Sequence, residues 1–160
     1  MLTPLTLYYA GPLFTDAERA WNTANALTLR ARLPTWRVLM PQEFCAALDS
    51  DASGKPRYDL IAKACLDHLA LADVVLAVLD GADPDSGTCF EAGWAVARNI
   101  PVIGLRTDWR PAEDGAANCM LTRTCRSVER SLDAVIAAIS GLHPGTAGFS
   151  LHGVTNGDAS

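Results

Sequence analysis

The sequence lacks the patterns that mark several large classes of protein. No run of lysine or arginine occurs, and the formal net charge is −5, so neither nucleic acid nor an anionic membrane surface is an expected partner. No apolar run approaches the roughly 20 residues that cross a bilayer. The N-terminus has neither a basic region nor a cleavage site, unlike a signal peptide. We therefore expect a cytoplasmic protein whose partner is a small molecule.

Metal-ligand and disulfide patterns are also missing. The cysteines number five, which is odd, they form no Cys-x-x-Cys pair, and the three histidines are scattered. Without an export signal, the cysteines are expected to be reduced thiols. The sequence therefore predicts no metal site and no cofactor.

What is present indicates one compact domain. Apolar residues make up 49% of the 160 residues, which is enough for a substantial core. We assign residues 1–141 to this domain and treat 142–160 as a glycine-rich C-terminal tail. Short apolar runs alternate with helical patterns, which predicts a parallel sheet between two layers of helices. The predicted strands are Leu5–Ala10, Trp36–Met40, Asp73–Asp80 and Pro101–Leu105, and the predicted helices are Asp16–Arg32, Tyr58–Ala72, Thr88–Asn99 and Val128–Ile139.

Ligands of such sheets bind beyond the carboxyl ends of the strands, where the strand order reverses. This directs attention to three loops, Gly11–Thr15, Asp80–Thr88 and Arg106–Asn118. The second loop and the helix after it place four carboxylates within twelve residues. Their mutual repulsion is costly unless they bind a ligand or face water. A Mg²⁺ site is one alternative use, but no phosphate cradle of the P-loop type accompanies them.

Glu91 is the candidate nucleophile of this segment. Its neighbours are apolar or small, so its carboxylate is expected to be partly desolvated near a helix N-terminus that favours the anion. In an alternative reading, Thr88 and Glu91 form a capping box, and Glu91 only satisfies a backbone N–H. Asp80 and Asp83 have a similar alternative as turn formers. Asp85 lies six residues before Glu91, at the same junction of loop and helix.

The first loop joins two tyrosines to a Gly-Pro turn. Tyr8 and Tyr9 alternate along a strand and point to opposite faces of the sheet, so one hydroxyl can reach the pocket and donate to Glu91. Packing of both rings under helices is the alternative. Phe14, just past the turn, is suited to stack on a planar ring or to staple the helix that follows.

Four segments carry a family resemblance, and they occur in the family's order between Leu5 and Leu121. They resemble segments of the nucleoside 2-deoxyribosyltransferases. The resemblance implies a flavodoxin-like, Rossmann-like three-layer sandwich with a five-stranded parallel sheet. The four segments are Tyr8–Phe14, Ala72–Val75, Asp85–Gly93 and Asn118–Leu121.

The resemblance also implies a reaction and roles. Glu91 attacks the anomeric carbon of a 2′-deoxynucleoside, the base leaves, and a second free base attacks the covalent deoxyribosyl-enzyme, with overall retention. Tyr8 orients or tunes Glu91, and Asp85 contacts the leaving base and helps to protonate it. Asn118, together with Met120, completes the site of a neighbouring subunit, which implies a homo-oligomer, a dimer or a hexamer. The other candidate substrate-binding residues are Gly11, Pro12, Phe14, Asp80 and Gly87.

Two segments fit the resemblance less well. Family members often carry an acidic residue where this chain has Cys65, with Asp67 two positions later. Base contacts and base preference therefore stay open. The Arg106–Arg110 segment has no assigned role.

Three other functions are compatible with the same fold. A nucleoside or nucleotide N-glycosidase would give the sugar to water, but the turn at Gly11–Phe14 has no basic or hydroxyl residue, which disfavours a 5′-phosphate there. A non-catalytic nucleotide-binding module would keep the pocket without needing an ionised Glu91. A flavodoxin is disfavoured because the first loop lacks a phosphate cradle rich in serine and threonine.

Overall fold

The structure is a computed structural model that describes residues 4–142, with the exception of 49, 52, 56 and 116. The predicted tail, apart from Leu142, lies outside the described residues. Along the chain, the elements are β1 (Leu5–Ala10), α1 (Asp16–Arg32), β2 (Trp36–Leu39), α2 (Pro41–Phe44), the short 3₁₀ helix η1 (Ala46–Leu48), α3 (Tyr58–Leu69), β3 (Val74–Val78), α4 (Ser86–Ala97), β4 (Val102–Leu105), α5 (Cys119–Thr124), β5 (Ser127–Glu129) and α6 (Leu132–Ser140).

The five strands form one parallel sheet in the order β2-β1-β3-β4-β5. This is the flavodoxin-like order that was expected, and the direction of winding reverses between β1 and β3. Tyr8 of β1 lies beside Val75 of β3 in the register. Ligand chemistry is therefore expected where the loops after β1 and β3 meet.

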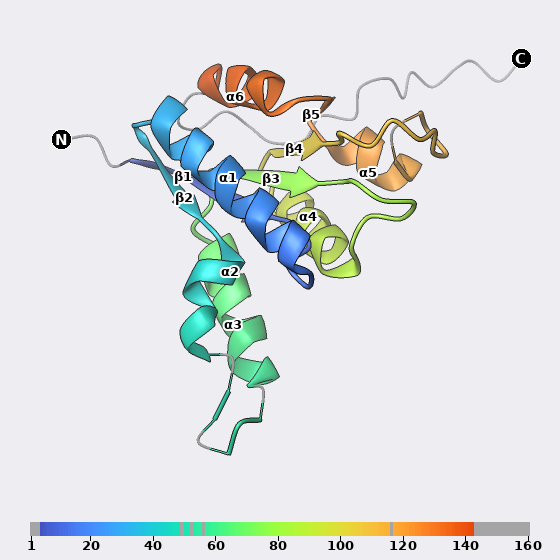
Figure 1. Ribbon diagram of the computed structural model, residues 1–160. Coiled ribbons are helices and arrows are strands. Elements are labelled where there is room, and N and C mark those ends of the chain that lie inside the picture. The colour runs from blue at the N-terminus through green and yellow to red at the C-terminus, as the bar shows by residue number, and fades with distance from the viewer. Residues whose placement is uncertain (1–3, 49, 52, 56, 116, 143–160) are drawn as a thin grey trace, which may run out of the picture.

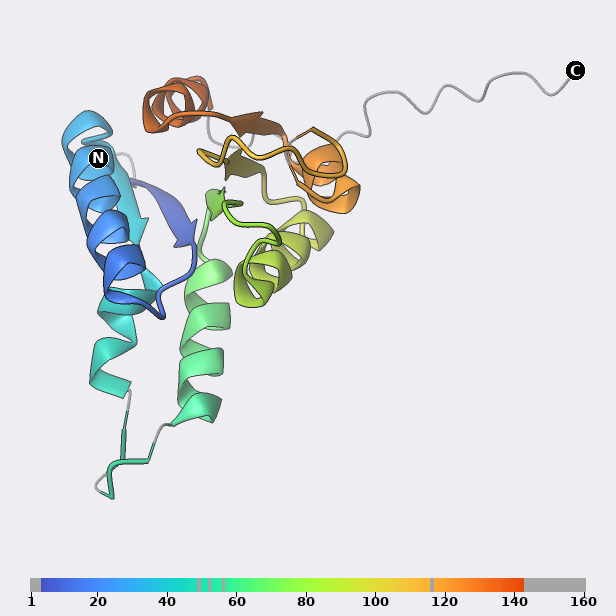
Figure 2. The same cartoon turned by 45° about the vertical axis from the view of Figure 1, so that its right-hand side comes forward.

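Helices cover both faces of the sheet (Figures 1 and 2). Alternate residues of β3 point to opposite faces, so Leu76 packs with α1 and α6, whereas Ala77 packs with α3 and α4. All five residues of β3 are buried, as expected for a strand covered on both faces. This burial fixes the position of β3 beside β1, and therefore the points at which the loops after these two strands begin.

The end of the domain differs from the prediction. The segment predicted as the start of a helix at Val128 is instead β5, and α6 begins at Leu132 after an N-cap by Ser131. Gly104 allows β5 to approach, because a Cβ there would lie 3.2 Å from Cγ2 of Val128 and 2.8 Å from Cδ1 of Leu79. The β-branched side chain suits the strand better than the helix that the apolar periodicity indicated.

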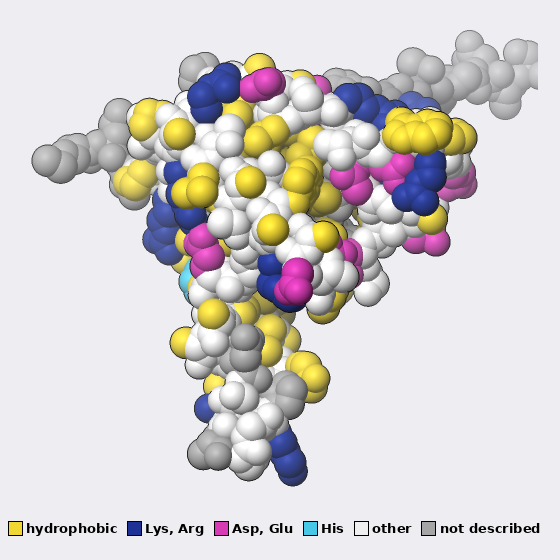
Figure 3. Space-filling view, viewed as in Figure 1, with side chains coloured by type: hydrophobic (Ala, Val, Ile, Leu, Met, Phe, Trp, Pro, Cys, Tyr) yellow, Lys and Arg dark blue, Asp and Glu magenta, His cyan; other side chains and the backbone are white. Residues whose placement is uncertain are grey.

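A projection made of α2, η1 and α3, residues 41–69, extends below the sheet (Figures 1 and 2). Its two sides are held together by the rings of Phe44 and His68, which stack with centroids 4.0 Å apart. Phe44 also contacts Tyr8, at 6.3 Å between ring centroids, which joins the projection to the sheet. The space-filling view shows hydrophobic side chains on the surface of this projection (Figure 3).

Candidate active site

Glu91 lies in the second turn of α4, the helix that follows β3. The helix begins at Ser86, two residues earlier than predicted, and its N-cap is Asp85. The capping-box alternative for Thr88 and Glu91 is therefore wrong, since Thr88 is inside the helix. The carboxylate of Glu91 is therefore not used to cap the helix.

The carboxylate of Glu91 is tied to the sheet by Tyr8. The Tyr8 hydroxyl donates to Oε1 of Glu91 at 2.5 Å, although the two residues are 83 positions apart. Tyr8 is fully buried, so this orientation is fixed by packing. Tyr9 points to the other face, where its hydroxyl donates to Asn22 at 3.1 Å and accepts from Asn25. The predicted alternation therefore sends one tyrosine to Glu91 and one to the opposite core.

The environment of Glu91 raises the pKa of its carboxyl group, so that the protonated and the ionised forms are both well populated at neutral pH. Burial raises its pKa from 4.5 to about 7, and the negative charge of Asp85 adds to the rise. The hydrogen bond from Tyr8 acts in the opposite direction, because it stabilises the anion. Burial and Glu91 also raise the pKa of Tyr8, so the phenol keeps its proton and remains a donor. A carboxylate that is anionic yet poorly solvated is suited to nucleophilic attack.

The two carboxylate oxygens of Asp85 have different surroundings. Its Oδ2 accepts hydrogen bonds from the backbone N of Thr88 at 2.8 Å and from the Thr88 hydroxyl at 3.1 Å. Its Oδ1 makes no hydrogen bond with the part of the chain that the structure describes. Gly87 allows this arrangement, since a Cβ at that position would lie 3.1 Å from Oδ2.

Glu91 and Asp85 open onto one cavity of about 520 Å³, a size typical of small-molecule sites. Gly11, Phe14 and Gly87 line the same cavity, so the structure brings together five of the predicted residues. The other walls of the cavity, which the sequence did not predict, come mainly from the start of α1 and from the projection. These further lining residues are Leu13, Arg19, Pro41, Gln42, Cys45, Ala46, Tyr58, Ile61, Cys65 and Thr88.

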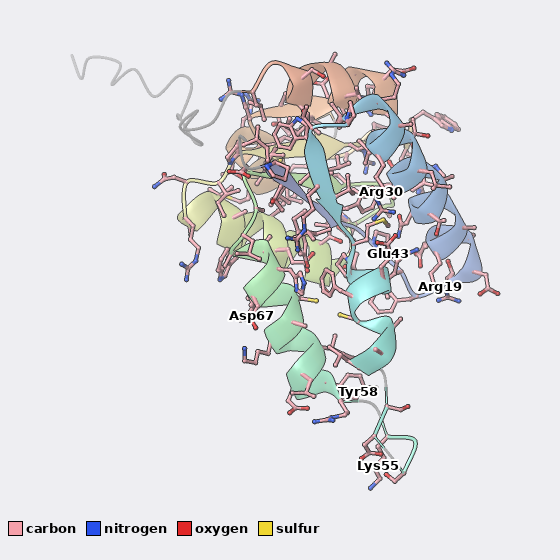
Figure 4. All side chains as sticks on the ribbon, turned by 90° about the vertical axis from the view of Figure 1, so that its left-hand side faces the viewer. Arg19, Arg30, Glu43, Lys55, Tyr58 and Asp67 are labelled. Carbon is pink, nitrogen blue, oxygen red and sulfur yellow. The ribbon has the colours of Figure 1, made fainter. Side chains whose placement is uncertain are left out.

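The missed wall could not be read from motifs, because its residues belong to short or ordinary elements. Tyr58 lies at the start of α3, and in the side-chain view its ring lies on the side of α3 that faces α2 and η1 (Figure 4). Arg19 donates to the carbonyl of Leu13 at 2.9 Å and also pairs with Asp16, so it brings a cation to the mouth of the cavity.

Comparison with known proteins identifies the family. The model of the nucleoside 2-deoxyribosyltransferase family matches residues 7–143. The chain belongs to this family. Membership supports a nucleoside-processing enzyme. No curated protein matches the sequence.

Solved structures with the same fold include deoxyribosyltransferases. A conserved protein from Enterococcus faecalis is 27% identical over 85% of this chain and 97% of its own, with a TM-score of 0.74. The 2-deoxyribosyltransferase of Leishmania mexicana is 25% identical over 88% and 99%, with a TM-score of 0.62. That of Bacillus psychrosaccharolyticus is 20% identical over 92% and 98%, with a TM-score of 0.69, and shows the fold alone.

Two predicted residues of this deoxyribosyltransferase-family chain line a different hollow from Glu91. Pro12 and Asp80 lie on the other side of the first loop, in a hollow of about 460 Å³. Asp80 accepts from the backbone N of Thr107 at 2.6 Å and of Asp108 at 2.8 Å, so it fastens the loop after β4. A part in substrate binding stays a prediction for both.

Asn118 and Met120 also lie away from the cavity that contains Glu91. Asn118 caps α5 by accepting from the backbone N of Met120 at 3.0 Å, and it donates to Glu113 at 2.8 Å. Both line a hollow against α4, and the Met120 side chain is 70% exposed. Their role in a neighbouring site stays a prediction.

The Arg106–Arg110 segment, which the sequence left without a role, is built around a buried guanidinium. Arg106 is 1% exposed, and it donates to the carbonyls of Leu79 and Gly81. Its Nε has no partner within the described part of the chain. Arg106 therefore connects the ends of β3 and β4 and supports the loop that leads to Asp85.

The described residues contain neither a metal-ligand cluster nor a membrane-spanning helix. No group of three or more histidine, cysteine or acidic side chains there is arranged to hold a metal ion. Among the same residues, no helix has the length and apolar character needed to cross a bilayer.

Proposed function

We propose that this chain is a transferase that exchanges the base of 2′-deoxynucleosides. An oxygen of Glu91 attacks C1′, and the electrons of the N-glycosidic bond leave with the base. A nitrogen of a second free base then attacks C1′, and Glu91 departs as a carboxylate. Two inversions give overall retention, in the manner of a retaining glycosidase. The single observation that carries this proposal is the half-buried Glu91 carboxylate, held by Tyr8 at 2.5 Å on the wall of the cavity.

The pKa of Glu91 supports the role of a nucleophile. A value of about 7 leaves a large anionic fraction at neutral pH. The Tyr8 hydrogen bond fixes the direction of the reactive oxygen and restrains the carboxylate, which favours a near-attack geometry. The absence of a 2′-hydroxyl on the substrate helps as well, because that electron-withdrawing group would oppose the developing positive charge.

Other residues have proposed positions around the base. Asp85 contacts the departing base through the oxygen that does not cap α4, and it helps to protonate the base by passing on a proton that it takes from solvent. Phe14 is 73% exposed and lines the cavity, so it is free to stack on a planar ring. Gly11 and Gly87 let backbone approach the substrate closely. Asn118 and Met120 complete the site of a second copy of the chain, so the active form is a homo-oligomer.

A second candidate is hydrolysis of a nucleotide, and Arg19 is the observation that favours it. The turn after β1 has no basic residue, but the structure brings Arg19 of α1 to the same cavity. A guanidinium there offers a partner to a 5′-phosphate. The fold is shared with the CMP N-glycosidase of Clostridium botulinum, which is 17% identical over 84% of this chain and 97% of its own, at a TM-score of 0.52.

The decisive experiment is a chromatographic time course with purified protein and 2′-deoxyinosine, with and without adenine. Formation of deoxyadenosine only in the presence of adenine and of intact Glu91 supports the transferase. Equal release of hypoxanthine without an acceptor identifies a hydrolase. The deoxynucleoside monophosphate, tested in parallel, decides whether Arg19 serves a phosphate. If no substrate turns over, the chain is a binding module, and binding should then survive Glu91→Ala.

A further inference from the structure

Two cysteines meet inside the wall of the candidate active site. The Sγ atoms of Cys45 and Cys65 are 3.9 Å apart. Cys45 ends α2, and Cys65 lies in the middle of α3, so the contact spans the two sides of the projection. Sulfur atoms are visible between these helices in the side-chain view (Figure 4). Both residues line the cavity that contains Glu91.

The thiol of Cys65 is also in contact with the catalytic pair. It lies close enough to the Tyr8 hydroxyl and to Glu91 for both groups to act on its pKa. A series of neighbouring groups therefore runs from Cys45 through Cys65 and Tyr8 to Glu91. A reaction that moves Cys65 toward Cys45 changes the surroundings of Tyr8.

The two sulfur atoms are close but not bonded. A disulfide has an S–S distance of about 2.05 Å, so the Sγ atoms, now 3.9 Å apart, have to approach each other to form the link. Cys45 is followed by only a three-residue helix, η1, so its backbone belongs to a short element rather than to the sheet. Closure would link residues 20 positions apart without breaking any strand pairing.

We propose that Cys45 and Cys65 form a redox modification site, in which oxidation to a disulfide closes the substrate cavity. With a peroxide as oxidant, one thiolate attacks an oxygen and gives a sulfenic acid and water. The second thiol then attacks that sulfur and releases a second water, so two electrons and two protons leave the pair. A thiol reductant reverses the change by exchange.

Closure acts on the site in two ways. It draws the α2 side of the cavity toward the α3 side at the position where both cysteines line it. It also removes Cys65 from Tyr8, which loosens the group that orients Glu91. Conversely, a substrate that fills the cavity holds the two sides apart and should protect the thiols. This consequence for activity rests on the proposed function, whereas the link itself does not.

The rate of oxidation should depend on pH. Burial raises the pKa of the Cys65 thiol, and the charge of Glu91 adds to the rise. Since the thiolate is the reactive form, oxidation should accelerate as the pH increases. Cys119 is exposed and far along the chain on α5, and it provides a matched control.

The test treats the full-length protein with hydrogen peroxide or diamide and maps its peptides by mass spectrometry without reduction. We expect a Cys45–Cys65 link, a decrease from five thiols to three, and a loss of more than tenfold in base exchange that a thiol reductant restores. Cys45→Ala should abolish both the link and the sensitivity, relative to its own untreated activity, and Cys119→Ala should abolish neither. Cys45→Val serves as a second variant if the smaller side chain impairs folding.

Opposite results overturn the inference. Failure to form the link, or equal inactivation of Cys45→Ala, shows that the pair is only a packed contact. The mass measurement and the protection by 2′-deoxyinosine need no turnover. A link that forms and is slowed by the nucleoside, in a protein that transfers nothing, therefore supports this site and counts against the proposed transferase alone.

Discussion

The hydroxyl of Tyr8 donates a hydrogen bond of 2.5 Å to Oε1 of Glu91. Tyr8 lies in β1, the second strand in the order of the sheet, and Glu91 lies on α4, the helix that packs against that face of the sheet. This contact joins the two sides of the point where the strand order reverses. It couples the reactivity of Glu91 to the packing of the sheet, because Tyr8 is fully buried. Four predictions follow from this arrangement and from the contacts around it.

Tyr8→Phe should weaken the anionic form of Glu91. Without the phenol, the hydrogen bond that lowers the pKa of Glu91 is lost, so this pKa rises above 7. Base exchange at pH 7 should fall about 10- to 100-fold, and the acidic limb of the pH–rate profile should move to higher pH. Steady-state rates from pH 5 to 9 test this.

Tyr9→Phe is the matched control for that change. Tyr9 is on the other face and bonds to Asn22 and Asn25. We expect a loss of about 1 kcal/mol in unfolding free energy and no movement of the pH–rate profile. A profile that moves equally in both variants would contradict a specific role for Tyr8.

Glu91→Gln should make the folded protein more stable at alkaline pH. The folded pKa of about 7 lies above the ordinary 4.5, so the native state binds the proton more tightly than the unfolded state. The resulting stabilisation is complete below pH 4.5 and is lost as the pH rises through 7. Glutamine does not ionise, so it should exceed the wild type by about 1–3 kcal/mol at pH 8.5. Thermal unfolding at pH 4 should reveal no such advantage, and an advantage at both pH values would refute the explanation.

Asp85 can be separated into its cap and its charge. Asp85→Asn keeps a side-chain acceptor for the N of Thr88 but removes the charge that raises the pKa of Glu91. Its pH–rate profile should therefore shift to lower pH with nearly unchanged stability, and its maximal rate should fall, because an amide cannot pass a proton to the departing base. Asp85→Ala should also lose about 1 kcal/mol of unfolding free energy. Denaturant titrations and rate profiles of the pair distinguish the two roles, and identical stability losses would show that the cap is unimportant.

Arg106→Met should destabilise the fold by about 2–4 kcal/mol, because it leaves two buried carbonyls without their donor. Those carbonyls belong to Leu79 and Gly81, at the start of the loop that leads to Asp85. Exchange activity should fall as well, since the loop loses its anchor. Arg110→Met removes an exposed partner of Asp108 and should change stability little, because solvent screens an exposed ion pair. A comparable loss in both variants would argue against the buried anchor.

Much of this arrangement follows from local patterns in the sequence. Periodicity of two along residues 5–10 predicts that only one of Tyr8 and Tyr9 reaches the face that carries Glu91. The apolar run before Asp80 predicts a central strand, whereas the flavodoxin-like arrangement of the sheet was implied by the family resemblance and not by a local pattern. The start of α4 was less predictable, because both Thr88 and Asp85 are good caps, and only the three-dimensional course of the loop selects Asp85.

The cavity wall and the position of the fifth strand were not predicted from the sequence, for physical reasons. β5 is three residues long, and its pairing with β4 depends on the missing side chain of Gly104 rather than on its own pattern. Cys45, Tyr58 and Cys65 line the cavity only because the projection folds back beside β1, a long-range contact that leaves no local signal. Arg19 could not be predicted, because the periodicity of α1 marks its apolar face and gives no signal for a charged residue on another face.

The projection separates recognition from chemistry within one small chain. Tyr8 and Glu91 are supported by the sheet and α4, whereas much of the far wall of the cavity comes from a single excursion, residues 41–69, that shares no strand with them. Changes at positions of that excursion that line the cavity without contacting Tyr8, such as Tyr58 and Ile61, would reshape the cavity while leaving Tyr8 and Glu91 in position. Protein engineers could therefore vary much of the cavity wall within one continuous stretch of sequence. The contacts of that stretch with Tyr8 would have to be kept.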